Sequence, residues 1–98
     1  MSSPMSHLPP AELLDATHDF PCRFTFKVIG RDESDFPGRT LHAVREVLEL
    51  AGDTETSARR TANGKHVAVT IELEIDSAEQ VLQVYARLQR LDGLELLL

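Results

Sequence analysis

The feature that most constrains the fold is a strictly alternating segment in the second half of the chain. Its apolar residues take turns with small, polar or acidic ones in the order Val67-Ala68-Val69-Thr70-Ile71-Glu72-Leu73-Glu74-Ile75. A period of two predicts a strand with one buried face. Asn63-Gly64 precedes it and signals a hairpin, because both central residues of a type I′ turn need positive φ. We therefore predict that the polar segment Thr56–Ala62 pairs with this strand at the edge of a sheet.

Two amphipathic helices and two further strands are predicted around this hairpin. Alternation from Cys22 to Val28, closed by Gly30, predicts an earlier strand, and Leu94–Leu98 reads as a short last strand. After a polar loop over Arg31–Gly38, helical spacing relates Leu41, Val44, Val47, Leu48 and Ala51, with Gly52 as the terminating residue. A second helical stripe joins Ala78, Val81, Leu82, Tyr85 and Leu88, with Asp76 or Ser77 as its N-cap.

The order strand, helix, strand, strand, helix, strand predicts an α+β fold of the ferredoxin-like βαββαβ type. In this sandwich four antiparallel strands lie in the order 4-1-3-2, and both helices cover the one apolar face. Ninety-eight residues suffice for one such core, which we place at residues 20–98. Residues 1–19 are rich in Ser and Pro and predict either a fully disordered leader or a flexible tail. Such a tail would end in a helical turn over Ala11–Asp15, docked through Leu13 and Leu14.

The opening strand carries a resemblance to a known family. Phe20–Gly30 reads F-P-C-R-F-T-F-K-V-I-G and resembles the first strand of the YbeD-like family of small bacterial cytosolic proteins. Val84–Leu88, followed by Asp92-Gly93-Leu94, is similar to that family's closing helix and strand. The resemblance implies a ferredoxin-like fold akin to ACT-type regulatory domains and no established reaction. This chain departs from the pattern at the hairpin, where His66 stands in place of an aromatic residue.

Composition excludes several classes of function. Ten Lys and Arg against sixteen Asp and Glu give a net charge of -6, which disfavours binding to nucleic acid and to anionic membranes. The single cysteine, Cys22, cannot form an intrachain disulfide or a multi-cysteine metal site. We see no secretory signal and no apolar run of roughly 20 residues, so we expect a cytoplasmic protein. No paired nucleophile and base is recognisable, so we expect no enzyme, no catalytic residue, no metal and no cofactor.

Two candidate sites remain. One is the uncovered face of the sheet, which mixes both charge signs. Such a face is consistent with plain solvation and with docking of a protein partner or a second copy. Its candidate residues are Arg23, Lys27, His66, Thr70 and Glu72. The other site is implied by the similarity to ACT-type domains, in which the loop after the first strand helps to hold a small effector. There Gly30, Arg31 and Asp32 would supply backbone amides and a cation to an amino-acid-like metabolite.

The leading hypothesis is a non-enzymatic regulatory or interaction module that forms a homodimer or docks on a protein through the sheet face or an edge strand. The alternative is a domain that binds a small metabolite through the loop that follows Gly30.

Overall fold

The computed structural model describes residues 10–48 and 54–98, which form three helices and four strands. Ala51 and Gly52, predicted to close the first long helix, and residues 1–9 lie outside the described residues. In chain order the elements are α1 (Ala11–Thr17), β1 (Cys22–Arg31), α2 (Phe36–Leu48), β2 (Glu55–Arg60), β3 (His66–Ile75), α3 (Ala78–Leu88) and β4 (Leu94–Leu97).

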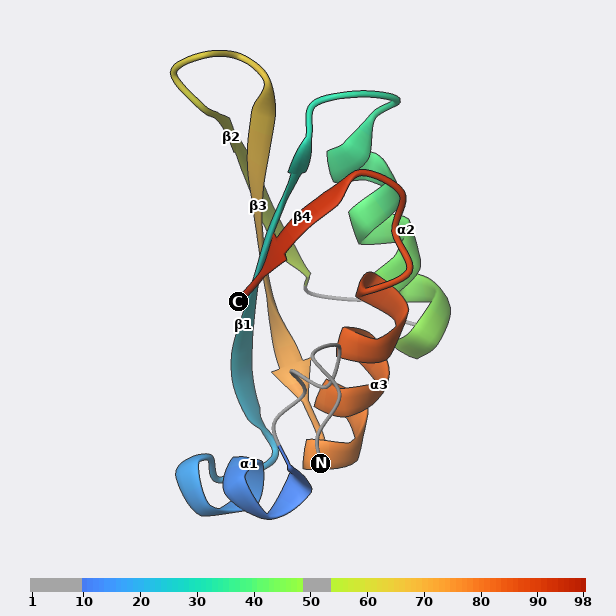
Figure 1. Ribbon diagram of the computed structural model, residues 1–98. Coiled ribbons are helices and arrows are strands. Elements are labelled where there is room, and N and C mark those ends of the chain that lie inside the picture. Colours follow the sequence, from blue (N-terminus) through green and yellow to red (C-terminus); the bar gives the residue numbers. More distant parts are fainter. Residues whose placement is uncertain (1–9, 49–53) are drawn as a thin grey trace, which may run out of the picture.

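The strands form one antiparallel sheet in the order β2-β3-β1-β4, which is the predicted order read from the other edge. Helices α2 and α3 both lie on one side of this sheet, and no helix of the described residues covers the other side (Figure 1). The ferredoxin-like α+β fold predicted from the alternating segments is therefore confirmed.

The core lies between the sheet and the helices α2 and α3. Phe26 and Val28 of β1 and Ile71 of β3 are fully buried, as their alternation with polar residues predicts. On the helical side, Val44 of α2 and Val84 of α3 are also fully buried. Burial of these apolar faces is the main stabilising contribution to the sandwich.

The segment before β1 contributes to the same core. Pro10 stands at the N-cap of α1, and this helix lies beneath the sheet at the end where β1 begins (Figure 1). Its Leu14 is buried in the core, and the ring of His18 lies 5.0 Å from that of Phe24, measured between centroids. The prediction that Leu13 also docks is wrong, because its side chain is 52% exposed.

The loop predicted to run to Gly38 ends earlier, because α2 begins at Phe36. The carboxylate of Asp35 accepts from the amide of Gly38, and the fixed φ of Pro37 suits the first turn of a helix.

The hairpin joins β2 to β3 as predicted, but not through a two-residue type I′ turn. Of Asn63 and Gly64, only Gly64 has a positive φ. The loop is longer: the amide of Gly64 donates to the carbonyl of Thr61, and the side chain of Asn63 accepts from the amide of Lys65.

Of the two predicted N-caps of α3, Ser77 occupies the position. Its hydroxyl accepts from the amide of Gln80, and the Gln80 side chain accepts in return from the amide of Asp76. This reciprocal arrangement resembles a capping box and explains why the helix begins directly after Ser77.

Candidate functional site: the open face of the sheet

The open face of the sheet is built by every second residue of the four strands. Cross-strand partners share a face, so the register decides which side chains stand there together. Arg23 lies opposite Glu74, Lys27 opposite Thr70, and the next pair along is Ile29 and Ala68. The five predicted face residues all stand on this side: Arg23, Lys27, His66, Thr70 and Glu72. Their role in docking stays a prediction.

An apolar patch occupies one part of this face. Leu96 of β4 lies opposite Ile29, and the backbone of Leu98 exchanges two hydrogen bonds with that of Lys27. Leu96 and Leu98 are 48% and 58% exposed. With Ala68, which stands beside Ile29 on β3, these residues define what we call the apolar patch: Ile29, Ala68, Leu96 and Leu98.

The surface is hollowed next to the apolar patch. Short side chains at Ser57, Ala68 and Thr70 leave a hollow of about 420 Å³ between longer neighbours. The hollow is also lined by Lys27, Arg59, Ile29 and Leu98. It therefore combines apolar and cationic side chains, which suits an apolar group that carries a carboxylate nearby.

Acidic residues gather toward the end of the face where β1 begins. Arg23 pairs with Glu55 of β2 at 2.7 Å, and the hydroxyl of Thr25 donates to Glu72 at 3.3 Å. These pairs are exposed, so they order the side chains and contribute little to stability. The face thus has a polar, acidic part and an apolar part bordered by cations.

The loop after β1 is the second predicted site, and the structure shows why its residues are there. Gly30 is buried, and a Cβ atom at this position would overlap the ring of Phe36. The amide of Arg31 donates to the carbonyl of Gly93, and the amide of Asp32 to that of Lys65. The amides that were predicted to receive a carboxylate are therefore already paired.

The charges around this loop are mainly negative. A hollow of about 290 Å³ beside the loop is lined by Asp32, Glu33 and Asp35 with one guanidinium, that of Arg60. Arg60 itself forms an ion pair with Asp32. Such a lining repels a carboxylate ligand. Metabolite binding through Gly30, Arg31 and Asp32 stays a prediction.

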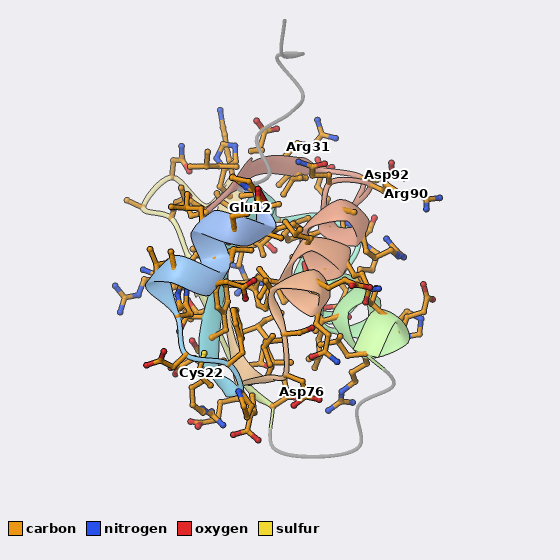
Figure 2. All side chains as sticks on the ribbon, turned by 90° about the horizontal axis from the view of Figure 1, so that it is seen from below. Glu12, Cys22, Arg31, Asp76, Arg90 and Asp92 are labelled. Carbon is orange, nitrogen blue, oxygen red and sulfur yellow. The ribbon has the colours of Figure 1, made fainter. Side chains whose placement is uncertain are left out.

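A residue that sequence reasoning missed holds this loop in place. The Arg39 guanidinium of α2 donates to the carbonyls of Ser34 at 2.8 Å, Asp92 at 3.1 Å and Glu33 at 3.3 Å. It thereby ties the loop after β1 to the turn before β4, where Arg31 and Asp92 lie near each other (Figure 2). An arginine on a helix carries no sequence signal for this role, because its acceptors are backbone carbonyls of two distant loops.

The described residues contain neither a group of potential metal ligands nor a helix that could cross a membrane. No three side chains among His, Cys, Asp and Glu come together there as a metal-binding group. Each helix in residues 10–48 and 54–98 is too short or too polar to cross a membrane.

Comparison with known proteins places the chain in a family. A model described as "Protein of unknown function (DUF493)" matches residues 15–98. The chain belongs to the DUF493 family. Relatives in this family include a UPF0250 protein of Pasteurella multocida, which is 31% identical over 93% of this chain and all of its own length. A UPF0250 protein of Vibrio cholerae is 30% identical over 82% of this chain and 85% of its own. The resemblance to the YbeD-like family is confirmed.

Solved structures share the fold of this DUF493 chain. The solution structure of protein HP0495 from Helicobacter pylori has a TM-score of 0.65 at 17% identity and covers all of this chain and 97% of that one. The ACT domain from GTP pyrophosphokinase of Chlorobium tepidum has a TM-score of 0.52 at 12% identity, over 83% of this chain and 97% of that one. The ACT-like architecture expected from the opening strand is therefore confirmed.

Proposed function

We propose that the protein is a non-enzymatic interaction module that docks a partner protein on the open face of its sheet. The observation that carries this proposal is the apolar patch, in which Leu96 and Leu98 are about half exposed beside Ile29. Apolar side chains that gather on one face, next to a hollow and rimmed by charges, are typical of a docking surface.

The charge of the face indicates the chemistry of the partner. Four cationic side chains stand there, those of Arg23, Lys27, Arg31 and Arg59, against three carboxylates, those of Glu55, Glu72 and Glu74. The chain as a whole carries -6, so its acidic excess lies elsewhere. The cations Lys27 and Arg59 border the hollow, which favours a partner segment in which an apolar side chain stands next to an acidic one.

The neighbours in fold support a regulatory form of this proposal. In Chlorobium tepidum an ACT domain of the same architecture belongs to GTP pyrophosphokinase. We propose that this chain supplies a comparable module, which binds its target through the open face. A partner held in this way would leave the core and the helical side unchanged, as expected for a pre-organised interface.

The experiment uses a photo-crosslinking amino acid at Leu96 in living cells, with the same amino acid at Leu13 as the matched control. Leu13 is an equally exposed leucine, 52% against 48%, and it stands on α1. We expect a discrete crosslinked product from position 96 that is absent from position 13. Leu98→Glu in the crosslinking chain should reduce this product at least tenfold. A crosslinking pattern that is the same at both positions would contradict the proposal.

A further inference from the structure

Strand β2 is the least covered element of the sheet. It lies at the edge, paired to β3 alone, and all six of its residues are exposed. Side chains of both faces are exposed, so neither the helical layer nor any other described element packs over β2. The outer edge of such a strand presents unpaired backbone N–H and C=O groups, which is the usual template for the addition of another strand.

The charges along β2 make the strand complementary to itself. Glu55 and Arg59 stand on the open face on either side of Ser57, at equal distance from it along the strand. If a second β2 ran antiparallel beside the first, with Ser57 opposite its own copy, each Glu55 would face Arg59 of the second copy. Opposite charges directly across two strands stabilise the pairing, and the two-fold symmetry produces the contact twice.

We propose that a second copy of this chain pairs with β2 in this register, so that the two sheets join into one of eight antiparallel strands. The two-fold axis passes between the two Ser57 residues. The Glu55 carboxylate already accepts from Arg23 at 2.7 Å, and its exposed position leaves room for a second guanidinium. Arg59 is exposed, and it has no ion pair within residues 10–48 and 54–98.

Other registers lack this complementarity. A two-fold axis perpendicular to the sheet keeps the helices of both copies on the same side of the joined sheet. Residues that lie opposite each other across the two β2 strands then belong to the same face. Centred on Ala58, this arrangement places Ser57 opposite Arg59, and centred on Arg59 it brings like charges together. Among the registers that stay within the described strand, only the one centred on Ser57 pairs Glu55 with Arg59.

This inference goes beyond the proposed function and uses the outer edge of β2, although Arg59 also lines the hollow of the open face. Joining the sheets at β2 leaves Ile29, Leu96 and Leu98 of the apolar patch uncovered, because β3 separates β1 and β4 from β2. The dimer would therefore display two docking faces side by side. Leu98→Glu, which is designed to block the open face, should leave the dimer intact, so the two proposals can fail separately.

The first experiment exchanges charges and measures the molar mass in solution by sedimentation equilibrium over a concentration series. We expect the wild-type chain to dimerise. Arg59→Glu alone and Glu55→Arg alone should each raise the dissociation constant about tenfold or more, since each variant turns two attractive contacts into repulsive ones. An equimolar mixture of the two variants should form a heterodimer about as tight as the wild type, because unlike charges face each other again.

The second experiment tests the register with single cysteines in a Cys22→Ala chain. In the proposed pairing the two residues at position 57 have Cα atoms roughly 4.5 to 5.5 Å apart, within reach of a disulfide. In the same pairing each residue 56 lies opposite residue 58 of the other copy. The two residues at position 56 are therefore offset by two positions along the strand direction, which places their Cα atoms about 8 Å apart, too far for a disulfide. Under oxidising conditions Ser57→Cys should therefore form a covalent dimer, and the matched control Thr56→Cys should not.

The outcomes are decisive in each case. A wild-type chain that stays monomeric at the highest soluble concentration overturns the proposal. If neither charge reversal changes the dissociation constant of the dimer, or if mixing the two variants does not restore it, the Glu55–Arg59 contact is overturned. Disulfide formation at position 56 as fast as at position 57 overturns the register.

Discussion

The ring of Phe36 at the start of α2 packs directly against the backbone of Gly30 near the end of β1. Phe36 is fully buried, and the space that a side chain on residue 30 would occupy is filled by its ring. The helix therefore approaches the strand more closely here than any residue with a Cβ atom would allow. Gly30 lies in the predicted ligand loop, and this contact explains its presence without a ligand.

Adding one methyl group at this contact should destabilise the fold. We expect Gly30→Ala to lower the free energy of unfolding by about 1–3 kcal/mol, because the added Cβ atom would overlap the fully buried ring of Phe36. Urea denaturation of Gly30→Ala, Phe36→Leu and the double variant measures the coupling between the two sites. The double variant should be more stable than the two single losses added together predict. If the two losses of stability were strictly additive, the ring of Phe36 would not restrict the size of the side chain at residue 30.

Removing the Arg39 guanidinium should loosen the loop after β1. We expect Arg39→Ala to cost about 1–3 kcal/mol, since three carbonyls lose a charged donor. Arg39→Lys should recover only part of this, because a single ammonium group cannot span carbonyls of two separate loops.

Hydrogen exchange locates this effect. In Arg39→Ala the amides of Arg31 and Asp32, which donate to Gly93 and Lys65, should exchange faster than in the wild type. Arg45→Ala, on the exposed side of the same helix, serves as the control and should change neither the stability nor these amides. Equal exchange in all three proteins would contradict the bridging role of Arg39.

We expect the folded protein to lose stability at alkaline pH because of the phenol of Tyr85. Burial raises the pKa of the Tyr85 phenol above its ordinary value near 10, because the phenolate is disfavoured next to apolar groups. The ring of Tyr85 meets those of Phe24 and Phe26 edge-on, at centroid distances of 6.4 and 5.4 Å. Above about pH 10 the unfolded chain loses the proton first, so the free energy of unfolding falls as the pH rises through the folded-state pKa.

Tyr85 is the only tyrosine of the chain, so its ionisation can be followed directly. Ultraviolet titration of the phenolate should give a midpoint above that of the unfolded protein in denaturant. Between about pH 9 and pH 11 the wild type should lose more stability than Tyr85→Phe, which cannot ionise. A midpoint equal to that of the unfolded chain would show that the phenol is fully hydrated.

Most of the secondary structure was predictable because it is dictated by local periodicity. The alternation in β1 and β3 assigned each residue to the buried or the open face, and the structure agrees at Phe26 and Ile71 as at Lys27 and Thr70. The errors arose where a tertiary contact overrides a local signal. Phe36 lies in the predicted polar loop, yet its burial against Gly30 anchors the first turn of α2.

The candidate site was predictable only in part. The sequence by itself determined which residues of each strand share a face, because side chains alternate with a fixed period of two. The order of the elements along the chain also predicted which strands are neighbours, including β2 at the edge. Only the tertiary structure decided the register of β4 on β1, which brings Leu96 next to Ile29 and leaves Leu96 and Leu98 about half exposed. This register includes a shift between Ile29 and Gly30, and it joins residues too distant in the chain for any local pattern to record.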